Sequence, residues 1–277
     1  MDNAPIGIFD SGYGGLTVAR AVIDKLPDEN VIYLGDTLNT PYGPRPIAEV
    51  RKLSLAGLDY LVSLGVKALV IACNTATAAA LSDARERYWI DQRIPVIEVV
   101  TPAARSAVAT TRNRCIGIIG TQATVQSEAY QNALAAVPDL HVVARACPRF
   151  VEFVEAGITT GPELMAVAHE YLDPLREAGV DTLILGCTHY PLLTGAIGRV
   201  MGDTVSLVTS SEATANVAYN DLVDRNMLHE PLGLDDAPDL QFLTTGGPSR
   251  FAKLARRFLG PEVTGAEEVD VPGGTVE

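Results

Sequence analysis

The sequence predicts an α/β protein with two similar domains, each built on an open, mostly parallel sheet. The two domains are related by a pseudo-twofold axis, with the active site in the cleft between them. Short apolar runs alternate with helical patterns along the 277 residues, as in parallel sheets that helices cover on both faces. Residues 65–75 align without a gap to residues 179–189, which places Cys73 and Cys187 at equivalent positions. Residues 6–11 resemble residues 116–121 at a similar offset, so the chain shows an internal duplication.

The predicted elements follow from these runs in order. Continuous apolar stretches of strand length predict strands over residues 6–9, 31–35, 68–72, 96–99, 115–119, 141–146, 182–185, 205–208 and 241–244. Helical patterns predict helices over residues 16–25, 47–64, 75–88, 124–135, 148–156, 162–178, 191–200, 211–226 and 248–259. Residues 36–46 contain three prolines and a glycine among other breakers, which predicts a loop. The acidic, glycine-rich end, residues 263–277, is expected to be a flexible tail.

Composition and charge exclude several classes of protein. The net charge is −13, from 21 basic and 34 acidic residues, so we expect no direct binding to nucleic acid. No apolar run reaches the roughly 20 residues that a membrane span needs, and the first residues do not resemble a signal peptide. We therefore expect a cytoplasmic protein that does not enter membranes. Four cysteines in a chain of this size are not a disulfide framework.

Polar side chains stand where predicted strands end. Asp10, Ser11, Cys73, Thr121 and Cys187 all follow such strands. In open α/β sheets, ligands bind beyond the carboxyl ends of the strands. If the two halves face each other, one shared cleft contains these residues, and the two thiols flank a ligand from opposite sides.

The cysteines allow other interpretations. Cys115 and Cys147 have no repeat partner and are expected to be small buried apolar residues. Cys73, Cys187 and His189 could form a metal site, but they lack the closely spaced ligand pairs of structural zinc sites. A disulfide between Cys73 and Cys187 is disfavoured in a reducing compartment. The prediction is no metal.

Common organic cofactors are also disfavoured. The glycines of residues 12–15 lack the GxGxxG spacing of a dinucleotide loop. Pyridoxal phosphate needs a Schiff-base lysine, and Lys25, Lys52, Lys67 and Lys253 are all expected at surface positions on helices or before strands. The chain is expected to work without a cofactor.

Four motifs resemble the signatures of one known family. They are the sequence DSGYGG at residues 10–15, PYG at residues 41–43, CNTA at residues 73–76 and LGCTHYPL at residues 185–192. In this order they resemble the glutamate racemases, members of the cofactor-independent aspartate/glutamate racemase family, and the resemblance runs from about residue 6 to residue 258. It implies interconversion of L- and D-glutamate, which supplies D-glutamate for peptidoglycan in a bacterial cytoplasm.

The resemblance implies a two-base mechanism. One cysteine removes the α-proton as a thiolate and the other delivers a proton to the opposite face as a thiol. Cys73 is implied to act on D-glutamate and Cys187 on L-glutamate, with Asp10, His189 and Glu152 as assisting groups. The implied substrate-binding residues are Asp10, Ser11, Pro41, Tyr42, Gly43, Asn74, Thr75, Thr121, Thr188 and His189.

Some of these polar residues also precede helices. Ser11, Thr75 and Thr124 stand in positions that favour helix caps, and capping is compatible with ligand binding for the first two. Thr124 is interpreted as a cap alone.

The resemblance also implies domain boundaries and partners. Residues 1–97 with 210–262 would form the domain of Cys73, and residues 98–209 the domain of Cys187. A homodimer is expected, and contact with DNA gyrase rests on family analogy alone. Two alternatives stay open: an aspartate or hydantoin racemase of the same superfamily, and a non-catalytic protein that binds a small ligand.

Overall fold

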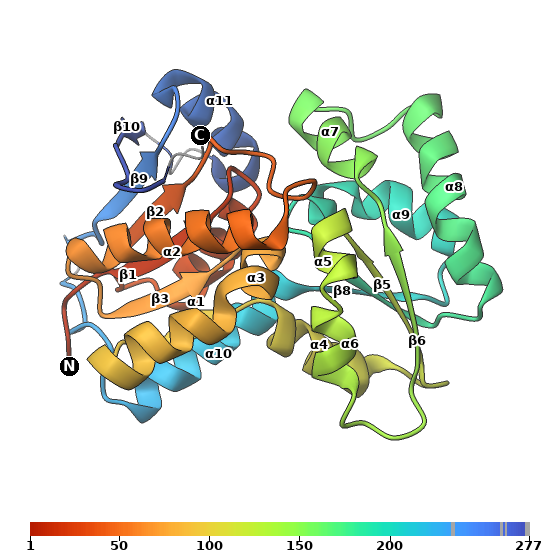
Figure 1. The fold of residues 1–277 in the computed structure, drawn as a ribbon, viewed down its shortest axis with the longest axis horizontal. Helices are drawn as coiled ribbons and strands as arrows, with labels where there is room; N and C mark the ends of the chain where they lie inside the picture. Colours follow the sequence, from red (N-terminus) through yellow and green to blue (C-terminus); the bar gives the residue numbers. More distant parts are fainter. Residues whose placement is uncertain (234–235, 261–262, 264, 275–277) are drawn as a thin grey trace.

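The computed structural model describes residues 1–233, 236–260, 263 and 265–274, and it contains two parallel sheets, each covered by helices (Figure 1). The two sheets stand side by side, with the first half of the chain and its C-terminal part around one and the middle of the chain around the other. The predicted fold class, two parallel-sheet α/β units, is confirmed.

The larger sheet has six strands in the order β10-β9-β2-β1-β3-β4, and every pair is parallel. Its strands are β1 (Ile6–Asp10), β2 (Val31–Gly35), β3 (Ala68–Ile71), β4 (Val96–Glu98), β9 (Leu240–Thr244) and β10 (Glu267–Glu268). Every residue of β1, β2 and β3 is buried, as expected for strands that helices cover on both faces.

Two groups of helices cover the two faces of this sheet. One apolar cluster includes buried residues of α1 (Leu16–Lys25), α10 (Ser210–Asp224) and α11 (Pro248–Leu259). The opposite cluster includes α2 (Ile47–Ser63), α3 (Asn74–Ala84) and the π-helical turn η1 (Arg85–Ile90). Ile8 packs into the first cluster and Phe9 into the second, because neighbouring strand residues point to opposite faces.

The smaller sheet has four parallel strands in the order β6-β5-β7-β8. These strands are β5 (Cys115–Gly120), β6 (His141–Ala146), β7 (Thr182–Gly186) and β8 (Ser206–Thr209). The helical segments of this half are α4 (Val100–Thr110), α5 (Gln122–Gln126), α6 (Ala129–Leu134), α7 (Arg149–Ala156), α8 (Pro162–Glu177), η2 (Tyr190–Leu193) and α9 (Thr194–Met201). Buried residues of α7, α8 and α9 pack on one face, and those of α4 and α6 on the other.

The two sheets repeat the same strand order. In the first half β1 lies between β2 and β3, with β4 beyond β3; in the second, β5 lies between β6 and β7, with β8 beyond β7. The strands that precede Cys73 and Cys187 are therefore β3 and β7, which occupy equivalent places. This is the arrangement that the duplicated sequence segments predict.

Several elements differ from those predicted. The helix expected over residues 124–135 is two short helices, because the backbone of Glu128 between them is left-handed, with φ 55°. Helix α4 was not predicted. Pro102 does not interrupt this helix, because it lies in the first turn, where a missing N–H costs little. The helix expected over residues 75–88 continues as a π-helical turn after Ala84.

The flexible tail predicted for residues 263–277 is wrong for the part of it that the structure describes; residues 264 and 275–277 lie outside that part. Val263 and Val271 are buried in apolar clusters, and β10 pairs with β9. Asn39 Nδ2 also donates a hydrogen bond of 2.6 Å to the carbonyl of Gly274. The segment is acidic overall, but it also contains apolar side chains such as Val263 and Val271, which pack into the protein core.

One lysine is also not where the sequence predicted it. Lys67 was expected on the surface, but its side chain is fully buried and its Nζ lies 2.5 Å from Glu29 Oε2. It also donates to the carbonyl of Asp2, while Glu29 Oε1 accepts the backbone N–H of His229. This ion pair joins the start of β3 to the chain's first residues and to the segment after α10.

No helix among the described residues combines the length and the apolar character that crossing a bilayer requires.

The substitution Lys67→Met should lower the free energy of unfolding by about 3–5 kcal/mol, because the Glu29 carboxylate would stay buried without its partner. Urea denaturation measures this change. Glu163→Gln is the matched control: it breaks an ion pair with Arg149 on the surface and should cost less than about 1 kcal/mol. Equal losses in the two variants would contradict the prediction.

Candidate active site

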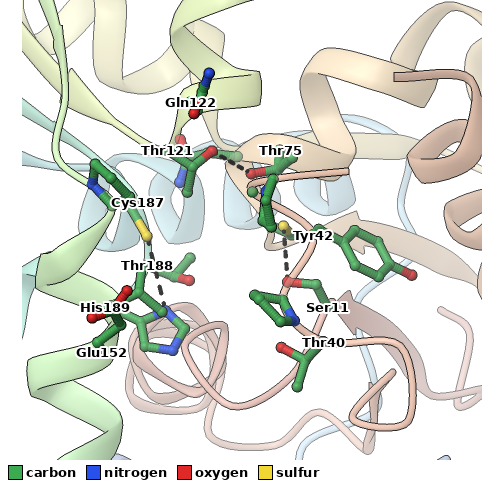
Figure 2. Close-up of a pocket in the computed structure, with 17 residues that line it drawn as sticks. Ser11, Thr40, Tyr42, Thr75, Thr121, Gln122, Glu152, Cys187, Thr188 and His189 are labelled. Atoms are coloured by element: carbon green, nitrogen blue, oxygen red, sulfur yellow. Dashed lines mark hydrogen bonds between the residues drawn. The ribbon is translucent and has the colours of Figure 1, made fainter. Parts of the chain in front are cut away.

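A cavity of about 180 Å³ lies where loops from both halves meet (Figure 2). Loops after β1, β2 and β3 form one side, and loops after β5, β6 and β7 form the other. This is the place where open parallel sheets bind ligands, here supplied by two sheets at once. The cavity is smaller than the roughly 300–1,000 Å³ of drug-sized sites, so its occupant is a small molecule.

The structure brings together twelve of the thirteen residues predicted for the site. The cavity is lined by Ser11, Pro41, Tyr42, Gly43, Cys73, Asn74, Thr75, Thr121, Glu152, Cys187, Thr188 and His189. Asp10, the thirteenth, is buried just behind the wall. Sequence reasoning missed five lining residues: Thr40, Pro44, Gln122, Pro148 and Val151. Each of the five is a neighbour of a predicted residue or of a predicted strand end, and proximity of this kind was the signal that could have found them.

Cys73 is held by the turn between β3 and α3. It is the N-cap residue of α3, where its Sγ accepts the backbone N–H of Ala76 at 3.4 Å and lies 3.3 Å from Ser11 Oγ. Burial, and then the negative charge of Asp10, raise the pKa of the Cys73 thiol to about 12, against the pull of these two hydrogen bonds. At neutral pH the sulfur is therefore a protonated thiol.

Asp10 is buried behind the side of the cavity that carries Cys73. Its Oδ2 accepts the backbone N–H of Gly12 at 2.9 Å and the Tyr33 hydroxyl at 3.3 Å. Its Oδ1 has no hydrogen-bond partner among the described residues. Burial raises the pKa of Asp10, and the charge of His189 across the cavity partly offsets that rise. An unpartnered buried carboxylate oxygen is a natural partner for a cationic group.

Cys187 stands opposite, in the turn after β7. Its Sγ lies 3.8 Å from His189 Nδ1, and Figure 2 shows both across the cavity from Ser11, whose hydrogen bond leads to the Cys73 sulfur. Burial by itself would lower the pKa of His189. Contacts with Cys187 and Glu155, and the charge of Asp10, overcome that effect and raise it to about 10.

His189 has an acidic neighbour that was not among the predicted site residues. Glu152, the predicted assisting glutamate, lines the cavity. The carboxylate near the imidazole is Glu155, whose Oε1 lies 3.5 Å from His189 Nε2. The two glutamates are three residues apart on α7, so the helix carries both on adjoining surfaces. Sequence spacing alone could not decide between them.

A glycine lets the two halves approach closely. A Cβ atom on Gly14 would lie 2.3 Å from Thr188 Oγ1 and 2.5 Å from His189 Nδ1, far inside contact distance. Thr17 Oγ1, one turn further on, is 3.3 Å from the carbonyl of Thr188. The DSGYGG segment thus forms the surface against which Thr188 and His189 pack.

Three threonine hydroxyl groups form hydrogen bonds between the two halves of the protein. Thr75 Oγ1 lies 2.9 Å from Thr121 Oγ1 and 3.2 Å from Thr124 Oγ1. Thr121, not Thr124, is the N-cap of α5: its Oγ1 accepts the backbone N–H of Thr124. The prediction that Thr124 is only a cap is wrong, because its hydroxyl contacts both Thr75 and Thr121.

The arrangement is suited to proton transfer at a single atom. Two thiols from equivalent strand ends reach one small cavity, and each has its own titratable neighbours. Among the residues that the structure describes, no lysine or arginine lines this cavity, so an anionic ligand would be bound by hydroxyl, amide and backbone donors.

Comparison with known proteins agrees with this geometry. The family model for Asp/Glu/Hydantoin racemase matches residues 16–218. A glutamate racemase of Beutenbergia cavernae is 61% identical over 99% of this chain and 96% of its own length. A crystal structure of glutamate racemase from Bacillus anthracis is 38% identical, with a TM-score of 0.88 over 98% of this chain and 99% of that one. A crystal structure of the Francisella tularensis enzyme in complex with D-glutamate is 34% identical, with the same TM-score and coverage.

His189 should stay protonated well beyond neutral pH, because its folded pKa of about 10 exceeds the ordinary value of 6.5. The resulting stabilisation is complete below pH 6.5 and is lost as the pH rises through about 10. NMR titration of the imidazole in the ligand-free protein measures this pKa.

Two glutamine variants separate the neighbouring glutamates in the same titration. Glu155→Gln removes a carboxylate that contacts the imidazole and should lower the pKa of His189. Glu152→Gln removes an equal charge from the cavity wall and should leave that pKa nearly unchanged. The reverse ranking would contradict the pairing described here.

Proposed function

This chain belongs to the glutamate racemases of the Asp/Glu/Hydantoin racemase family, and we propose that it interconverts L- and D-glutamate with two cysteines, Cys73 and Cys187, and no cofactor. The observation that carries the proposal is the delivery of two thiols to one small buried cavity from equivalent positions of a duplicated sheet. Inversion at a carbon needs a base on one face and an acid on the other, and this arrangement supplies both.

The protonation states suggest how a reaction would begin. With a pKa of about 12, Cys73 is a proton donor at neutral pH. The ammonium group of glutamate would bring a positive charge next to Asp10 Oδ1 and the sulfurs, which favours a thiolate. Cys73 would take the α-proton of D-glutamate and Cys187 that of L-glutamate. The opposite thiol then gives its proton to the planar carbanion, and the roles of the two cysteines reverse.

Each sulfur has its own assisting groups in this mechanism. Ser11 and the N-terminus of α3 surround Cys73, and a helix N-terminus favours a thiolate. On the other side, His189 places a positive charge beside Cys187 and is itself paired with Glu155. We propose Glu155 as the residue that holds His189 charged and oriented. Glu152 would act at the cavity wall, toward the substrate.

Neutral donors would recognise the two carboxylates of glutamate. The candidates are the hydroxyls of Ser11, Thr75, Thr121 and Thr188, the amide of Asn74 and the backbone around Gly43. The Tyr42 hydroxyl is excluded from this role, because it donates to Asp36 at 2.6 Å, while its ring contributes to the wall together with Pro41. Hydrogen bonds to a developing carbanion from groups already in place require little reorganisation in the transition state.

Glutamate is favoured over the alternative substrates. The family model includes aspartate and hydantoin racemases, so it does not choose among them. The relative at 61% identity is a glutamate racemase, and the two solved structures compared above carry the same name. A non-catalytic ligand binder would have no need for two thiols with titratable partners in one cavity.

We place the enzyme in the bacterial cytoplasm, where D-glutamate is consumed in peptidoglycan synthesis, and expect it to act as a homodimer. Contact with DNA gyrase remains a family analogy. In the proposed division, the chain passes from one domain to the other near residue 98 and again between Thr209 and Ser210, where β8 ends and α10 begins. We include residues 265–274 in the first domain as well, because β10 pairs with β9 and Val271 is buried against the same sheet.

Racemisation of L-glutamate in deuterated water, without added cofactor, tests the proposal. Deuterium should enter only the inverted product at early times, because the two faces of the carbon meet different thiols. NMR and chiral chromatography follow label and configuration. Early deuterium in L-glutamate itself would point to a single base that serves both faces.

Cys73→Ala and Cys187→Ala should each lower racemisation at least about 10³-fold in both directions, since each removes one of the two proton carriers. Each variant is expected to exchange the α-proton of one enantiomer alone. Cys115→Ala is the matched control: Cys115 is buried, and its thiol donates to the carbonyl of Ala178, outside the cavity. Exchange that survives in the double Cys73/Cys187 variant would reject the mechanism.

A further inference from the structure

Tyr130 lies between the two cysteine-bearing turns, although it was not among the predicted site residues. It belongs to α6 and is buried. Its hydroxyl donates a 2.6 Å hydrogen bond to Oδ1 of Asn74, the residue after Cys73. Its ring packs against Gly186, the residue before Cys187: a Cβ there would come within 2.9 Å of the ring carbon Cε2. One side chain from the second half thus contacts both turns.

The hydrogen bond from Tyr130 fixes which way the Asn74 amide faces. Burial raises the pKa of Tyr130 far above its ordinary value, so the phenol stays protonated and acts as the donor. In this structure the phenol donates to the amide oxygen, and the NH₂ group of asparagine cannot accept that bond. Asn74 Nδ2 then occupies the other position, where it has no hydrogen-bond partner among the described residues.

A buried NH₂ group without a partner is costly unless a ligand accepts its hydrogen bond. Asn74 is only 2% exposed and lines the cavity. We propose that Tyr130 is a positioning residue for the racemisation: it locks the Asn74 amide with its nitrogen available to a carboxylate of glutamate. This inference rests on the proposed function, in which Asn74 binds substrate.

Loss of the hydroxyl would free the amide to rotate. An amide turned by half a circle exchanges its oxygen and nitrogen, so it would present an acceptor to an anionic substrate group. The bound substrate would lose its hydrogen bond from the Asn74 NH₂ group, and its carboxylate would be repelled by the amide oxygen. The ring of Tyr130 would still pack against Gly186, so the turn that carries Cys187 would keep its place.

Tyr130→Phe tests the hydroxyl alone, because the ring is kept. We expect KM to rise about tenfold for both enantiomers and kcat to change less than about threefold, as for an interaction with the bound substrate. Enantiomers have equal free energies, so kcat/KM must fall by the same factor in both directions. Circular dichroism of the glutamate solution follows the two directions separately.

A double-mutant cycle with Asn74→Ala distinguishes positioning from general structural support. Once the amide is absent, Tyr130→Phe should change kcat/KM by less than about twofold. Tyr88→Phe is the matched control, because it removes another tyrosine hydroxyl with two protein partners, Asp59 and Leu55, far from the cavity. It should leave KM and kcat unchanged, and thermal melting of all variants checks that they are folded.

Three outcomes would overturn the inference. The first is a Tyr130→Phe enzyme with unchanged KM while Asn74→Ala is impaired. The second is a double variant in which the fold-losses in kcat/KM of Tyr130→Phe and Asn74→Ala multiply, as they do for independent residues. The third is an Asn74→Ala enzyme with full kcat/KM, which would show that the amide does not bind substrate. The cysteine mechanism would stand in all three cases, since the Cys73 and Cys187 variants test it independently.

Discussion

The structure depends on one geometric requirement: two sulfurs from distant parts of the chain must meet in a single small cavity. Parallel strands meet this requirement, because the residue that follows each strand lies at the same edge of its sheet. Repeating the order β2-β1-β3-β4 as β6-β5-β7-β8 gives the second sheet an equivalent edge. When the two edges face each other, Cys73 and Cys187 approach from opposite sides, and Gly14 leaves room for Thr188 and His189 to pack against the first half.

Burial is the second constraint, and it couples the charges of the two halves. Asp10 from the first half raises the pKa of both Cys73 and His189, while His189 from the second half lowers that of Asp10. The imidazolium is stable in a buried place only because Glu155, Cys187 and Asp10 surround it. Docking of the two halves and protonation of the site are therefore one linked equilibrium.

Strand-end chemistry could be predicted from the sequence, and contacts made across the cavity could not. The duplicated segments identified Cys73 and Cys187, because a repeat preserves position within a sheet. Glu155 was not predicted, because its approach to His189 depends on the orientation of α7, which packing in three dimensions decides. Tyr130 gave no signal, since a tyrosine in a short helix is usually a core residue. The acidic composition of residues 265–274 predicted a flexible tail, but apolar side chains in this segment pack against the larger domain.

The path of the chain has a consequence for its synthesis. The four-stranded sheet is continuous in sequence, from Cys115 to Thr209, so its strands can pair as soon as that stretch has left the ribosome. The six-stranded sheet must wait, because β2 pairs with β9 across about two hundred residues that include the whole of the other sheet. Until then one side of β2 is an open edge, a state prone to wrong pairing. The half that begins first is thus the half that is finished last, and the nascent protein has one completed lobe before it has a cavity.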